Sequence, residues 1–290
     1  MNTVPFFDKL WAYRTFNISI MLDKLSGATR VHIIVGDPIA QVKSPFGMTQ
    51  AFELNGRDAI CIPAQVPTAD LKQWFEGISL ARNVDGVIVT VPHKFDCHAF
   101  CATNSPRADF LGAVNTIRRN ADGTWHGDMF DGLGYVKAIE SKGFDLKNKK
   151  ALLVGAGGAG SAIAHAMVLA GVRELAIHDE NIDRRESLIA RLNSLKLGHV
   201  RAGNSNPTGF EVAINATPVG MREGDPLPID IEAITPDMFI GCVITAPAVP
   251  PLIAAARAKG CNTSTGADMF VQVRELMVQF LLETTTSESV

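Results

Sequence analysis

This 290-residue chain lacks an excess of charge of either sign, a framework of paired cysteines and long apolar runs. Its 27 basic and 30 acidic side chains give a net charge of -3, so there is no electrostatic case for binding nucleic acid or an anionic membrane surface. No apolar run reaches the roughly 18 residues that a membrane-spanning helix needs. The first residues carry charges without an apolar core, so no signal peptide is predicted. We therefore expect a cytoplasmic protein without membrane or nucleic-acid partners.

The five cysteines are odd in number and few for a chain of this length, so a disulfide framework is not expected. Cys97 and Cys101 lie close to His93 and His98, a combination that can bind a metal ion. A C-x-x-x-C spacing without a second pair is more typical of a half-buried helix face. We predict reduced cysteines and no metal.

The composition that remains is that of a globular protein. Apolar residues make up 47% and charged residues 20%, and the length suffices for two domains. Residues 1–28 form an N-terminal extension in which Phe6, Leu10, Trp11 and Phe16 are too apolar for a free tail. We expect the extension to pack on the body or on a partner subunit, and a monomer and a homodimer both stay open.

From Arg30 onward, short apolar runs alternate with helical patterns. This alternation predicts an α/β fold with mostly parallel sheets, whose ligands bind beyond the carboxyl ends of the strands. Ser44 followed by Pro45 predicts a helix start with Ser44 as the N-cap. The predicted strands are 31–35, 59–63, 86–91, 151–154, 175–179, 211–217 and 239–244; the predicted helices include 44–54, 68–82, 251–259 and 268–282; 117–127 is a predicted hairpin and 263–266 a predicted loop.

The run Val154–Gly160 reads V-G-A-G-G-A-G and joins an apolar strand to a helix of small residues. Gly155, Gly157 and Gly160 fit G-x-G-x-x-G. The first glycine permits a tight turn, the second removes a side chain that would block a pyrophosphate, and the third lets helix and strand pack closely. The amides at the helix start then face an anion. The run predicts a dinucleotide site, although glycine turns also occur for purely steric reasons.

The next strand bears on the choice of cofactor. It ends at Asp179, 19 residues after Gly160, near the roughly 20-residue spacing of a ribose-binding acid. Asp179 could accept hydrogen bonds from a free ribose diol and would repel a 2′-phosphate. Arg184 and Arg185 follow one turn later and are predicted to be solvated helix charges. We predict NAD as the cofactor, with NADP disfavoured.

Seven short motifs follow one another between residues 30 and 282: Gly36–Ile39 with Lys43–Pro45, Val89–Lys94, Gly112–Thr116, Gly127 with Asp131–Gly132, Val154–Gly160, Ile214–Met221 and Gly266–Gln272. Each motif is modest. In this order and at this spacing, the set resembles the shikimate dehydrogenase family.

This resemblance implies an open α/β substrate-binding domain, a Rossmann NAD(P)-binding domain and a cleft between them. The implied boundaries are 29–131 for the first domain and 132–266 for the second, with a helix at 267–285 returning to the first. Lys94 matches the family's catalytic lysine and Asp131 its partner, a pair that can position an alcohol and relay its proton. On spacing alone, both would be ordinary surface charges. Further matched substrate contacts are Ser44, Thr90, Asn115 and Gln272, and matched cofactor contacts are Gly155, Ala156, Gly157, Gly158, Ala159, Gly160, Asp179, Asn215, Thr217 and Gly266.

Five positions at the implied substrate site depart from the family's pattern. Val42 stands where the family usually has a serine that holds the substrate carboxylate, and Ile88 where it has an asparagine. Met129 and Phe130 replace Asn-Thr, and Thr245 replaces a tyrosine. A hydrogen bond to a charged group contributes about 1.5–3 kcal/mol. The departures therefore predict a more apolar substrate pocket and poor activity on shikimate.

The sequence thus favours an NAD-dependent oxidoreductase that acts on a cyclic hydroxy acid or its ketone. Its substrate could be a less polar hydroxy-cyclohexene or another small alcohol or ketone. One alternative is ordinary shikimate or quinate dehydrogenase activity, with a pocket re-formed by other residues. A second is a non-catalytic, cofactor-binding regulatory protein on the same fold.

Overall fold

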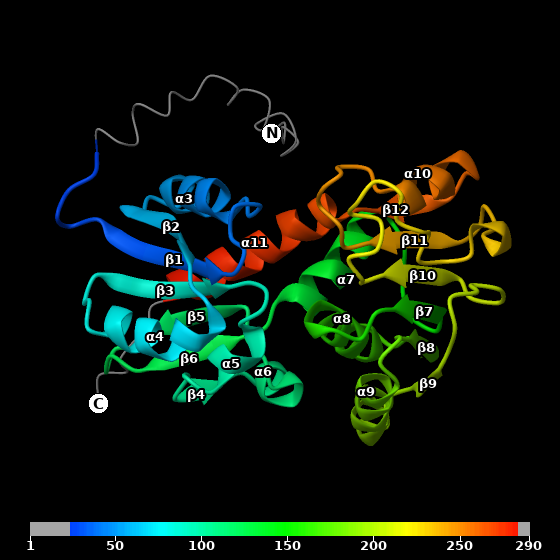
Figure 1. Ribbon diagram of the computed structural model, residues 1–290, viewed down its shortest axis with the longest axis horizontal. Coiled ribbons are helices and arrows are strands. Elements are labelled where there is room, and N and C mark those ends of the chain that lie inside the picture. The colour runs from blue at the N-terminus through cyan, green and yellow to red at the C-terminus, as the bar shows by residue number, and fades with distance from the viewer. Residues whose placement is uncertain (1–23, 284–290) are drawn as a thin grey trace, which may run out of the picture.

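The computed structural model describes residues 24–283 and contains two lobes, each built on a six-stranded sheet (Figure 1). The predicted α/β class is confirmed. The apolar residues predicted to anchor the N-terminal extension lie outside the described residues. Among residues 24–283, no helix combines the length and the apolar character needed to cross a bilayer.

The first sheet is mostly parallel, as predicted, and the predicted hairpin supplies its antiparallel pairings. The two neighbours of β1 run parallel to it, but the hairpin of β5 and β6 joins β3 antiparallel. Because β5 reverses direction between them, β3 and β6 run the same way and end at the same edge. The strand order is β2 (Ala59–Gln65), β1 (Arg30–Gly36), β3 (Val84–Val89), β5 (Thr116–Arg119), β6 (Trp125–Asp128) and β4 (Thr103–Asn104).

The second sheet is parallel throughout, as predicted. Its strand order reverses between β7 and β10, the point at which a doubly wound sheet binds a dinucleotide. The predicted loop at 263–266 instead includes an edge strand that pairs with β11. The strands are β12 (Asn262–Ser264), β11 (Phe239–Cys242), β10 (Val212–Asn215), β7 (Lys150–Val154), β8 (Glu174–His178) and β9 (His199–Ala202).

The helices differ from the predictions mainly at their ends. The predicted helix 68–82 is a 3-10 turn, η1 (Thr68–Asp70), followed by α4 (Leu71–Ser79). Ser44 is the first residue of its helix, and Lys43 is the N-cap, so the predicted cap is wrong by one position. The remaining helices are α3 (Ser44–Leu54), α5 (Lys94–His98), α6 (Pro106–Leu111), α7 (Asp131–Ser141), α8 (Gly158–Leu169), α9 (Ile182–Ser194), η2 (Ile231–Ala233), α10 (Pro251–Ala258) and α11 (Gly266–Leu282).

Helices α7 and α11 join the two lobes and run beside each other between the sheets (Figure 1). At Gly134 of α7, a Cβ would lie 2.9 Å from the backbone nitrogen of Val273 in α11, so only glycine allows this approach. Tyr135 is fully buried and its hydroxyl reaches the position that a Cβ would occupy on Gly241 of β11. α7 is therefore held rigidly against the second sheet, and its first residue projects toward the first lobe.

The hydrophobic core follows the two-residue period of the first sheet. Val87 and Val89 of β3 belong to one cluster, while Ile88 belongs to another on the opposite face. The cluster that contains Ile88 continues through α11 and α7 into the second lobe. The predicted domain boundaries stay a proposal; the two sheets, at 30–128 and 150–264, are compatible with them.

Candidate active site

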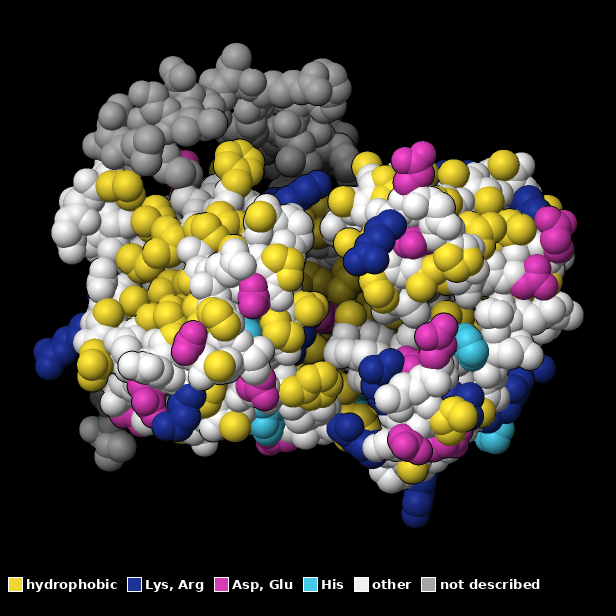
Figure 2. Space-filling view, in the orientation of Figure 1, with side chains coloured by type: hydrophobic (Ala, Val, Ile, Leu, Met, Phe, Trp, Pro, Cys, Tyr) yellow, Lys and Arg dark blue, Asp and Glu magenta, His cyan; other side chains and the backbone are white. Residues whose placement is uncertain are grey.

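The predicted catalytic pair meets at the shared edge of β3 and β6. Lys94 begins α5 shortly after β3, and Asp131 begins α7 shortly after β6. The Lys94 Nζ donates a hydrogen bond to Asp131 Oδ2. The side chains are 15% and 9% exposed, so the ion pair is shielded from water and still reachable from the cleft. Figure 2 shows the surface hollowed between the lobes, with apolar side chains along the hollow.

Asn115 holds Asp131 of this pair in position through a hydrogen bond. Its Nδ2 donates to Asp131 Oδ1 at 2.7 Å, and its Oδ1 accepts from the Phe130 amide at 3.0 Å and from Thr116 Oγ1 at 3.1 Å. Asn115 is 1% exposed. Its polar atoms are engaged inside the protein, so the geometry gives it a positioning role toward Asp131, and its predicted contact with substrate stays a prediction.

Three other predicted substrate groups lie around the same edge. Ser44 follows the end of β1, Thr90 follows the end of the neighbouring β3, and Gln272 lies in α11. Within residues 24–283, none of the three side chains makes a hydrogen bond, which leaves their polar atoms free for a ligand. Their contact with substrate stays a prediction.

The glycine turn has the steric properties that its sequence predicts. Gly155 has a φ of +106°, and a Cβ there would lie 2.9 Å from the carbonyl carbon of Ala216. A Cβ at Gly160 would lie 2.0 Å from the carbonyl oxygen of Gly155. At Gly157 a Cβ would meet nothing within 4 Å. The helix start is therefore held by the first and last glycines, and the middle one faces open space.

This open space suits a dinucleotide phosphate. Gly157 is the N-cap of α8 and provides no side chain to accept hydrogen bonds from the first amides of the helix. Free amides at a helix N-terminus attract an anion. The residues present thus fit a pyrophosphate, although Ala156 itself is buried.

Asp179 is tied to the glycine turn more closely than its spacing indicated. Its carboxylate accepts hydrogen bonds from the amides of Ala156 at 2.6 Å and Asn181 at 2.8 Å, and from Arg184 at 2.6 Å. Burial opposes ionisation, but these donors outweigh it and hold the pKa of Asp179 below its usual value. A carboxylate accepts about four hydrogen bonds, so these three donors use most of the capacity of Asp179, and its contact with a ribose diol stays a prediction.

Arg184 corrects a second part of that prediction. Its guanidinium pairs with Asp179 and is not simply a solvated helix charge. Arg185 instead pairs with Glu186. The signal that could have found this contact is the position of Arg184 in the first turn of α9, directly after the strand end at Asp179.

Comparison with known proteins decides the family. Residues 34–117 match the family model described as the shikimate dehydrogenase substrate binding domain. A shikimate dehydrogenase (NADP(+)) of Listeria monocytogenes is 30% identical over 262 residues, covering 86% of this chain and 89% of that protein. The chain belongs to the shikimate dehydrogenase family. Its relatives are oxidoreductases that act on CH-OH groups.

Solved structures of this family share the two-lobed fold. The L. monocytogenes shikimate 5-dehydrogenase in complex with shikimate and NAD has a TM-score of 0.81 and 28% identity, covering 89% of this chain and 93% of that one. The 5-ketofructose reductase of Gluconobacter sp. strain CHM43 has a TM-score of 0.78 and 26% identity, covering 88% of this chain and 93% of that one.

The departures from the shikimate dehydrogenase pattern are mostly packed into the core. Ile88 is 2% exposed and Phe130 4%, and both join one hydrophobic cluster on which the half-buried Val42 packs. The Phe130 ring lies 5.3 Å from that of Phe280, centroid to centroid. Both side chains contribute to core packing, and the prediction that they line the substrate pocket stays a prediction. They replace polar groups with core packing behind the site, while Val42 keeps a partly accessible face.

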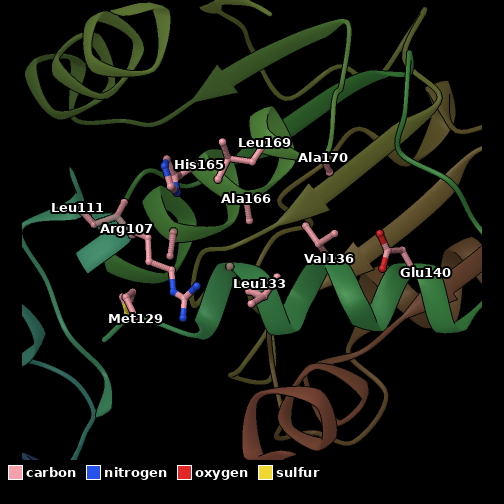
Figure 3. A pocket seen from close by; sticks show the side chains of 12 residues that line it. Arg107, Leu111, Met129, Leu133, Val136, Glu140, His165, Ala166, Leu169 and Ala170 are labelled. Carbon is pink, nitrogen blue, oxygen red and sulfur yellow. The ribbon is translucent and has the colours of Figure 1, made fainter. Parts of the chain in front are cut away.

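Met129 faces a different cavity (Figure 3). This cavity of about 250 Å³ lies between α6, α7 and α8, and Arg107, Leu133 and His165 also line it. Neither Lys94 nor Asp131 contributes to its walls. Met129 is 1% exposed, and its predicted role in the substrate pocket stays a prediction. Residue 129 precedes Asp131 by two positions, and a turn into α7 separates the directions of their side chains.

Several residues predicted to bind the cofactor make contacts that shape their own loops, and their contact with a cofactor stays a prediction. Asn215 is fully buried, and its Oδ1 accepts from the amide and hydroxyl of Thr217 at 3.0 and 2.7 Å. At Gly266 a Cβ would lie 2.2 Å from the carbonyl oxygen of Val243. These three positions hold the turn after β10 and the start of α11. Thr245 is exposed after β11, and its contact with a ligand stays a prediction.

The cysteine and histidine cluster forms no metal site among the described residues. Cys97 is buried and Cys101 half-buried, as a packed surface requires. Burial raises the pKa of the Cys101 thiol to about 12 and also raises that of Cys97. Burial therefore favours the neutral form of both thiols.

Proposed function

We propose that this protein is an NAD-dependent oxidoreductase that interconverts a small secondary alcohol and its ketone, in the class of cyclic hydroxy acids and related polyols. The observation that carries the proposal is the placement of Lys94 and Asp131 opposite the glycine turn. A Cβ on Gly158 would lie 4.0 Å from Lys94 Cδ, so the lysine and the phosphate-binding turn face each other across the cleft. A panel of alcohols and ketones monitored by NADH absorbance tests it.

A bound nicotinamide supplies the hydride acceptor or donor, and the protein supplies the proton path. In the reduction direction, the carbonyl carbon gains a hydride while its oxygen takes a proton from Lys94 Nζ. Lys94 recovers a proton from water, so the sum is ketone, reduced cofactor and one proton giving alcohol and oxidised cofactor. Asp131 holds Nζ in place, and Asn115 orients Asp131. In the oxidation direction, the neutral amine of Lys94 accepts the hydroxyl proton.

The apolar side chain of Val42 supports a substrate without a tightly held carboxylate. Ser44 remains, but the second serine of the family pattern is missing and Val42 cannot donate a hydrogen bond. The Gluconobacter relative is named for the reduction of 5-ketofructose, a ketone without a carboxylate. An uncharged polyhydroxy ketone is therefore a proposed substrate class beside the cyclic hydroxy acids.

We expect kcat/KM for shikimate to be at least about tenfold below that of the Listeria relative assayed alongside, since one charged hydrogen bond contributes about 1.5–3 kcal/mol. Val42→Ser should raise this value about tenfold, and Val42→Ala, which removes bulk without adding a hydroxyl, should not. Equal efficiency of the unmodified protein and the Listeria relative would instead support ordinary shikimate dehydrogenase activity.

NADH should bind at least about tenfold more tightly than NADPH, a difference of about 1.4 kcal/mol. The support is the ionised, buried Asp179, whose charge repels a 2′-phosphate and already neutralises Arg184. Asp179→Asn should narrow the ratio of the two dissociation constants, measured by NADH and NADPH fluorescence. Asp183→Asn removes a nearby exposed charge from the same helix and should leave the ratio unchanged. Tighter binding of NADPH to the unmodified protein would contradict the assignment.

A further inference from the structure

Phe95 is an exposed aromatic side chain in the cleft that the predicted site does not include. It follows Lys94 in the first turn of α5, and it is 52% exposed. Its Cε2 lies 3.7 Å from the position that a Cβ would take on Gly158, the first residue of α8. The ring therefore reaches from the first lobe to the phosphate-binding turn of the second.

The path of a dinucleotide passes this ring. The phosphates belong at the free amides of α8, beside the open face of Gly157. The reacting carbon of the nicotinamide must come within about 3–3.5 Å of a substrate whose oxygen is near Lys94. Since Phe95 Cε2 and Lys94 Cδ lie 3.7 and 4.0 Å from the same Cβ position on Gly158, a cofactor that runs from the start of α8 to Lys94 passes beside the Phe95 ring.

The geometry also tells which end of the dinucleotide is involved. Asp179 accepts a hydrogen bond from the amide of Ala156 in the glycine turn, and its proposed ligand is the adenosine ribose. The Phe95 ring and the Lys94 side chain both come within 4.0 Å of the Cβ position on Gly158, so the ring lies near the proposed proton donor and is assigned to the reacting end. A phenyl ring there offers an apolar face to a flat aromatic ring, and offset stacking of such rings is favourable beyond the area buried.

We propose that Phe95 stacks against the nicotinamide end of the cofactor and holds it in register with Lys94. This inference rests on the proposed function. It adds a cofactor contact from the first lobe. Lys94 and Phe95 are consecutive residues in the first turn of α5, so this contact would fix the position of the nicotinamide relative to Lys94.

The test compares two probes, NADH and ADP-ribose, which lacks the nicotinamide. Phe95→Ala should weaken NADH binding about fivefold to tenfold and leave ADP-ribose binding within about twofold. Phe95→Tyr, which keeps the ring, should restore NADH binding. The control is Leu80→Ala, which removes a similarly exposed apolar side chain, 84% exposed, beside α4. Thermal unfolding of each variant shows that the fold is intact.

The outcomes separate the two proposals. Equal weakening of NADH and ADP-ribose would show that Phe95 supports only the glycine turn, and no change in either would show that it makes no contact; both results overturn the inference while the proposed function stands. If the unmodified protein bound neither probe, the proposed function would fail and the Phe95 inference with it.

Discussion

Lys94→Ala lowers turnover about 10²–10⁴-fold, the range expected for loss of a general acid–base group. Asp131 and Asn115 remain, but no other amine is bonded to Asp131 in the described residues to transfer the proton. Dinucleotide affinity stays within about threefold, because the glycine turn and Asp179 are untouched. Steady-state rates on the best alcohol of the panel and an NADH titration measure the two effects.

Lys72→Ala is the control for this experiment. Lys72 is a lysine of α4 whose side chain is 75% exposed, and its removal should leave both rate and binding unchanged. Full turnover by Lys94→Ala would remove the proposed catalytic role. A protein that binds NADH but turns over no substrate, with or without Lys94, would match the non-catalytic alternative.

Gly160→Ala destabilises the fold by about 3 kcal/mol, at the upper end of the cost of overpacking. The added methyl group would lie 2.0 Å from the carbonyl oxygen of Gly155, a backbone atom that cannot move aside without opening the turn. Urea unfolding followed by far-ultraviolet circular dichroism measures the loss. NADH binding falls as well, since the same turn carries the phosphate site.

Gly157→Ala is the matched variant for this prediction. The new methyl group meets no protein atom within 4 Å, so stability should change by less than about 0.5 kcal/mol. It enters the space assigned to the pyrophosphate, and NADH affinity should fall about tenfold or more. If Gly157→Ala bound NADH normally, the dinucleotide would have to lie elsewhere.

The sequence by itself determined the parts that depend on local pattern. The glycine spacing predicted which glycines pack closely in the turn and which one faces open space, because these roles follow from the geometry of one strand–turn–helix unit. Alternating strands and helices predicted the parallel second sheet. Lys94 and Asp131 came from the resemblance, since nothing in their separate surroundings distinguishes them from surface charges.

Only the tertiary structure decided where neighbouring side chains point and what they have left to bind. Met129 and Asp131 are two residues apart, yet one faces the cavity at α8 and the other faces Lys94. Asn115 and Asp179 have the expected chemistry, but buried partners from distant segments use most of their hydrogen-bonding capacity. The physical reason is that burial and hydrogen-bond saturation depend on which elements meet across the two lobes, and no local window of sequence contains that information.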